Sequence, residues 1–151
     1  MDVVSLIRRD GDSVVDDAAT QVIAARLPHY EGDEAATRTR LEALLNRLLE
    51  SIETRDVSGL LAWASSLARE RYEAGFDLSE VQAAFNALEE VVWRRILAEV
   101  PPGSMAEALG LVSTALGAGK DALGRAYVSL ASQAHAPSLN LSRLFDGTDG
   151  V

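Results

Sequence analysis

The sequence predicts an all-α domain of about five helices. Alanine and leucine are abundant, whereas β-branched and aromatic residues are sparse, and this balance favours helix over sheet. Apolar residues recur at spacings of three and four along most of the chain, as on the buried side of amphipathic helices. The prolines, at positions 28, 101, 102 and 137, all lie between the candidate helices. Five helices with short connections predict an antiparallel helical bundle or globin-like packing, which differ in helix crossing angle.

The first three helices are predicted from these apolar stripes. The first begins near Val3, is interrupted around residues 10–12, which contain a glycine between two aspartates, and continues through Arg26. The second spans about residues 34–54. The third spans about residues 57–74 and follows an aspartate that can cap it.

The last two helices are separated by a Pro-Pro-Gly sequence. The fourth spans about residues 78–100. Residues 104–107, Ser-Met-Ala-Glu, fit a capping box and predict the start of a fifth helix that reaches about Gln133. We therefore expect one domain at residues 1–135 and a flexible C-terminal tail at residues 136–151.

The connection between the third and fourth helices is the most informative part of the chain. Gly75 suits the left-handed conformation that often closes a helix. Asp77 precedes Glu80 by three residues, which is an acidic variant of the capping box. The predicted helix corner consists of Tyr72, Gly75, Phe76, Asp77, Leu78 and Glu80.

This corner carries a family resemblance. Tyr-x-x-Gly-Phe-x-Leu-x-Glu-Val, followed by a helix with Leu-Glu-x-Val-Val-Trp, resembles the N-terminal domain of the RsbRD type, and the likeness extends over roughly residues 5–130. Such domains occur in co-antagonist proteins of the bacterial stressosome and ahead of other bacterial signalling modules. The resemblance implies an all-helical, non-haem, globin-like sensory or regulatory domain of a bacterial stress response, without catalysis of its own.

The resemblance also implies partners. Paired domains of this kind imply a homodimer in the cytoplasm that acts on a regulatory protein partner in signal transduction. The resembled domains usually precede an output module, and here residues 136–151 follow. We therefore expect the output to be another protein, or the chain to be a fragment.

Composition excludes several classes of partner and site. The net charge is −9 and Lys120 is the one lysine, so nucleic acid and anionic membrane are poor partners. The absence of cysteine excludes disulfides and thiolate chemistry and suits the cytoplasm. The longest apolar uncharged run, residues 108–119, is shorter than the ~20 residues of a membrane span.

Catalytic and cofactor motifs are missing from the sequence. The two histidines, His29 and His135, lie at helix ends, and there is no Glu-x-x-His pair for a di-iron site. Neither histidine has the mid-helix setting of a haem ligand. Serines lack a Gly-x-Ser-x-Gly motif and a neighbouring base. We therefore expect no enzyme activity, metal or cofactor; the alternative function is a small apolar-ligand carrier or degenerate globin-like binding protein.

Glycines recur every seven residues in the predicted fifth helix. Gly110, Gly117 and Gly124 share one face with Ser113. Each interior glycine costs roughly 0.5–1 kcal/mol relative to alanine, so the recurrence suggests close approach of another element. That element is a neighbouring helix of the same chain or a second copy in a homodimer; a helix that can kink is the third interpretation.

Aromatic residues gather around the predicted corner. Phe76, Phe85 and Trp93 are candidates for lining a small apolar pocket. Aromatic residues at helical spacing also suit an ordinary core, so both interpretations stay open.

Overall fold

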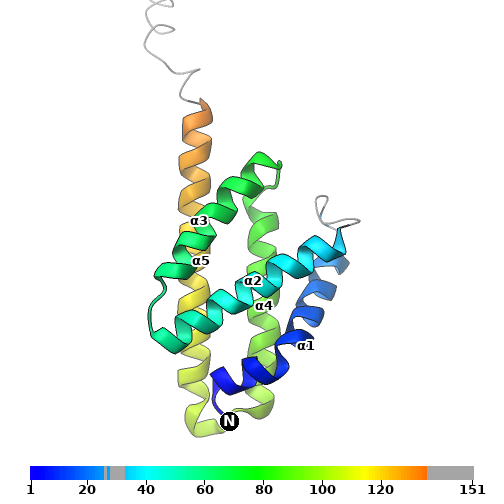
Figure 1. The fold of residues 1–151 in the computed structure, drawn as a ribbon, viewed down its shortest axis with the longest axis vertical. Helices are drawn as coiled ribbons and strands as arrows, with labels where there is room; N and C mark the ends of the chain where they lie inside the picture. The colour runs from blue at the N-terminus through cyan, green and yellow to red at the C-terminus, as the bar shows by residue number, and fades with distance from the viewer. Residues whose placement is uncertain (26, 28–32, 136–151) are drawn as a thin grey trace, which may run out of the picture.

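The computed structural model describes residues 1–25, 27 and 33–135, and these residues form five α-helices (Figure 1). The helices are α1 (Val3–Ala24), α2 (Glu34–Thr54), α3 (Ser58–Glu73), α4 (Leu78–Glu99) and α5 (Pro102–His135). No strand occurs in this described part of the chain, so the predicted all-α class is confirmed. The predicted tail at residues 136–151, and His29, lie outside the described residues.

Two predicted helix boundaries are wrong. The interruption expected around residues 10–12 is absent, because α1 runs through Gly11, where packing of the helix overrides the low propensity of glycine. The fifth helix begins at Pro102 rather than after Ser104. Proline suits the first position of a helix, since its φ is already helical and its missing N–H is not needed there.

The long helices α4 and α5 form an antiparallel pair along the long axis of the molecule (Figure 1). α3 packs on α5, and α1 packs on both α2 and α4. In Figure 1, α2 and α3 cross the α4–α5 pair obliquely. The arrangement is therefore not a bundle with aligned axes, although its α4–α5 pair has the antiparallel geometry that the sequence predicts.

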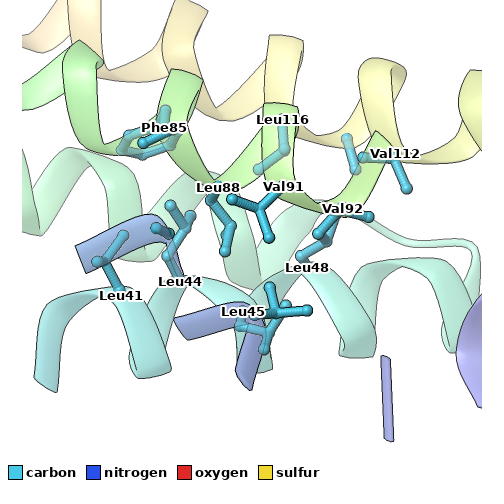
Figure 2. Packing of buried hydrophobic residues seen from close by; sticks show 14 of the residues in the cluster. Leu41, Leu44, Leu45, Leu48, Phe85, Leu88, Val91, Val92, Val112 and Leu116 are labelled. Carbon is cyan, nitrogen blue, oxygen red and sulfur yellow. The ribbon is translucent and has the colours of Figure 1, made fainter. Parts of the chain in front are cut away.

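The core includes buried side chains from all five helices, and Figure 2 shows the part of it between α2, α4 and α5. Leu48 of α2, Leu88 of α4 and Leu116 of α5 each have 0% of their surface exposed. Burial of each such side chain contributes about 1.5–3 kcal/mol, so these contacts stabilise the packing of the three helices.

A polar network joins α1 to α4 outside the core. The Arg95 guanidinium donates to Asp10 at 3.2 Å, to Ser13 Oγ at 2.8 Å and to Asp17 at 2.8 Å. Arg9 donates to Asp10 at 2.7 Å and also pairs with Glu99. These guanidinium groups, Arg9 first, lower the pKa of Asp10 from its ordinary value of 3.8.

Asp10→Asn is expected to make the stability of the protein less sensitive to acid. The pKa of Asp10 is lower in the folded than in the unfolded protein, so its contribution is fully present above pH 3.8 and is lost as pH falls through the folded value. Urea unfolding from neutral pH to below 3.8 measures this dependence. Asp12→Asn, at an exposed site on the same helix, is the control and should keep the wild-type slope. Equal slopes for all three proteins would contradict the assignment.

Candidate functional site

The predicted corner between α3 and α4 has the geometry of a Schellman motif. Gly75 is in the left-handed region with φ 87°. The Phe76 N–H donates to the Arg71 carbonyl at 3.0 Å, and the Gly75 N–H donates to the Tyr72 carbonyl at 3.1 Å. The chain therefore leaves α3 in one fixed direction.

The other side of the corner begins α4. Asp77 is the N-cap residue, with an extended backbone, and Leu78 is the first helical residue. The Asp77 N–H donates to Glu80 Oε1 at 3.0 Å, and Glu80 is 4% exposed. The carboxylate of Glu80 thus lies inside the corner, near the positive end of the helix dipole.

The corner is held against α5 by Tyr127. Its hydroxyl donates to the Phe76 carbonyl at 2.9 Å in a buried contact. Its ring meets that of Tyr72 edge to face, with centroids 5.6 Å apart. No sequence signal indicates this bond, because the acceptor is a backbone carbonyl 51 residues away.

Two arginines also surround the ring of Phe76. The Arg71 guanidinium lies 4.7 Å from the ring centroid, and the Arg40 guanidinium lies 6.0 Å from it. Arg71 is 8% exposed. Attraction between a guanidinium and an aromatic face favours this arrangement. The sequence analysis did not identify this contact between Arg71 and Phe76.

The structure does not bring the three predicted pocket aromatics together. Phe76 and Phe85 are buried, whereas Trp93 is 38% exposed on the outer side of α4. Positions 85 and 93 are eight residues apart, which rotates them by roughly 80° around a helix of 3.6 residues per turn. The tryptophan that packs near Phe85 is Trp63 of α3, with ring centroids 6.3 Å apart.

The three glycines of the predicted face do not lie against another described helix, whereas Ser113 of that face bonds Glu89 of α4 at 3.4 Å. A Cβ built on Gly110, Gly117 or Gly124 meets no described atom within 4 Å. The glycine at a close contact is Gly119, which the sequence analysis did not select. A Cβ there would lie 3.1 Å from Phe85 Cε2 and 3.4 Å from Leu60 Cγ.

The open glycines belong to a surface that we call the α4–α5 face. Trp93, Leu97 and Val128 are exposed there by 38%, 56% and 66%. Near its middle, Lys120 of α5 contacts Asn86 and Glu89 of α4 at 3.0 and 3.4 Å. The face consists of Trp93, Leu97, Gly110, Ser113, Gly117, Lys120, Gly124 and Val128.

The described residues contain neither a candidate metal cluster nor a helix that could span a membrane. No group of three or more His, Cys, Asp or Glu side chains there has a geometry that could hold a metal ion. None of the helices described is long and apolar enough to cross a membrane.

Comparison with protein families decides the classification. Residues 12–137 match the model of the RsbT co-antagonist protein RsbRD N-terminal domain. The chain belongs to this family. No curated protein and no solved structure gives a significant match. The matched region of this RsbRD-type domain includes the corner, Arg71 and the whole α4–α5 face, so these features lie in a signalling domain of the stressosome type.

Gly75→Val is expected to destabilise the domain by about 1–3 kcal/mol. A β-branched residue is strained at φ 87°, and the strain falls on the turn that directs α4. Gly75→Asn is the matched control and should cost less, since asparagine tolerates the left-handed region. Urea unfolding of the three proteins measures the difference. Equal losses of unfolding free energy for valine and asparagine would show that the left-handed backbone at this site does not determine the stability of the variants.

Gly119→Leu is expected to cost about 1–3 kcal/mol through overpacking against Phe85 and Leu60. Gly103 of the same helix meets no described atom within 4 Å of a built Cβ, so Gly103→Leu should be neutral or stabilising. Denaturant midpoints of both variants provide the measurement. A wild-type midpoint for Gly119→Leu would refute the close contact.

Proposed function

We propose that this RsbRD-type domain is a non-catalytic, cytoplasmic bacterial signalling domain. It forms a homodimer through the α4–α5 face and acts on a regulatory protein partner by shifting its helices. The family match supports the signalling role. The observation that supports the proposed homodimer is the exposed apolar surface near the open glycines of α5.

The position of the exposed apolar residues supports this surface. Of the four large hydrophobic side chains exposed in the described residues, Trp93, Leu97 and Val128 lie on the α4–α5 face, and Met1 does not. Trp93 and Leu97 lie one turn apart on α4, and Val128 lies near Gly124 on α5, so both helices of this face expose apolar side chains, as at an interface. The open glycines beside them allow a second helix backbone to approach closely.

Charged residues at the edges of the face suit contact between two identical copies. Arg94 pairs with Glu90 along α4, and Arg125 pairs with Asp121 along α5. In a two-fold dimer each surface meets the same surface of its partner, so a face that carries both signs of charge can be self-complementary.

Signal transmission would use α5. This helix carries the glycines of the α4–α5 face, and near its end Tyr127 bonds the α3–α4 corner. In Figure 1 the last turns of α5 extend beyond that corner. A movement of the corner would therefore shift the end of α5, a rearrangement of packed helices that a partner protein can detect.

Gly117→Leu is expected to weaken the homodimer by about 5- to 150-fold without unfolding the domain. A leucine at this position has room within the chain but would overpack a close interface, at a cost of about 1–3 kcal/mol. Sedimentation velocity over a range of concentrations gives the dimer dissociation constant. Ala62→Leu, at an exposed site on α3, is the control.

Two results would count against the proposed dimer. A monomeric wild-type protein would exclude it directly. An unchanged dissociation constant for Gly117→Leu would show that any dimer uses another surface. Circular dichroism of the variant confirms that a loss of dimer is not a loss of folding.

A further inference from the structure

We propose that the pocket between α2, α3 and α4 binds a small monocarboxylate, with Arg71 as its main anchor. This inference goes beyond the proposed signalling function and does not depend on the homodimer. The inference rests on the buried guanidinium of Arg71. This group lines the pocket, and its Nε donor has no acceptor within the described chain.

The pocket is lined mostly by apolar side chains, together with the two arginines Arg40 and Arg71. Leu67, Val81 and Phe85 are buried in its wall, while Arg40 and Trp63 are partly exposed. Its enclosed volume is about 20 Å³, which is room for roughly one water-sized group. The enclosed part therefore suits the end of a ligand, and the rest of that ligand would lie across the opening.

Arg71 supplies the donor. The residue is 8% exposed, and its Nε has no hydrogen-bond partner among the described residues. Its Nη2 pairs with Glu70, and its guanidinium lies over the ring of Phe76. A buried charged group is stabilised when each of its donors has an acceptor, so an oxygen that accepts from Nε would complete this site.

The charge balance favours an anion over water or an alcohol. Arg40 and Arg71 bring two positive charges to the pocket, and Glu70 is the one carboxylate within ion-pair distance of either of them in the described residues. None of the side chains that line the pocket is acidic, so two arginines favour an anion there. A hydrogen bond from a guanidinium to a carboxylate is also stronger than one to a neutral oxygen.

The size and polarity of the pocket limit the rest of the ligand. One carboxylate oxygen fits the enclosed volume, and a short apolar chain can lie against Trp63 and Ala84 at the opening. A short aliphatic monocarboxylate meets both requirements. Such a ligand would sit beside the Arg71–Phe76 contact, at the corner that Tyr127 joins to α5.

Titration with butyrate tests the site. In a nitrogen-15 correlation spectrum of the wild-type protein, the Nε–Hε signal of Arg71 should shift and saturate. The fluorescence of Trp63 should change in parallel, and Trp93→Phe removes the other tryptophan of the chain. Butanol, which has the same chain without the charge, and sodium chloride at equal ionic strength should produce neither change.

Matched lysine variants identify the anchor. Arg71→Lys keeps the charge but removes Nε–H, and should weaken butyrate binding by about 10- to 150-fold, as expected for loss of a hydrogen bond to a charged group. Arg69→Lys, at an exposed site on the same helix, should bind like the wild type. If Arg71→Lys does not fold, the wild-type Nε–Hε shift decides alone.

Three outcomes would overturn the proposal. An absent response to butyrate would exclude the site. An equal response to butanol would show an apolar pocket that does not recognise the anion. An equal response to chloride would show an adventitious ion only.

Discussion

The left-handed turn at Gly75 is the constraint on which the rest of this structure depends. Its φ of 87° allows the Schellman hydrogen bonds that close α3 and set the direction of α4. The same turn places Phe76 so that its ring lies under Arg71 and its carbonyl accepts from Tyr127. Helix termination, the cationic pocket and attachment to α5 thus depend on one backbone conformation.

The two sides of α5 show how one helix can serve both a core and an interface. Gly119 faces inward, where Phe85 and Leu60 leave little room for a side chain. Gly117, two residues earlier, faces outward and meets no described atom. Side chains two residues apart point about 200° apart around a helix. Gly117 and Gly119 therefore face opposite sides of α5, and each glycine needs its own explanation. The inward glycine accommodates the fold, whereas the outward one is explained by the proposed second copy.

Features that depend on a few neighbouring residues could be predicted from the sequence, whereas contacts between distant helices could not. The helix class, the left-handed Gly75 and the N-cap position of Asp77 follow from spacing and residue type, which act over a few residues. The end of α2 at Thr54 also matches its prediction, although Arg55, which follows it, adopts a left-handed φ of 57° without being glycine. The partners of Tyr127 and Phe85 depend on how distant helices cross, and no short motif encodes that geometry.

Arg71 shows why the corner is more than a helix connection. An apolar side chain of similar size would fill the same space without a charge to balance, and such replacements of buried charges are often neutral or stabilising. The contact with the Phe76 ring accounts for the position of the Arg71 guanidinium but not for its unused Nε donor. The proposed recognition of an anion would use this donor, because a carboxylate oxygen in the pocket can accept a hydrogen bond from Nε. The same residue accepts the Phe76 N–H through its carbonyl, so occupancy of the pocket and the geometry of the turn at Gly75 would be linked through one residue.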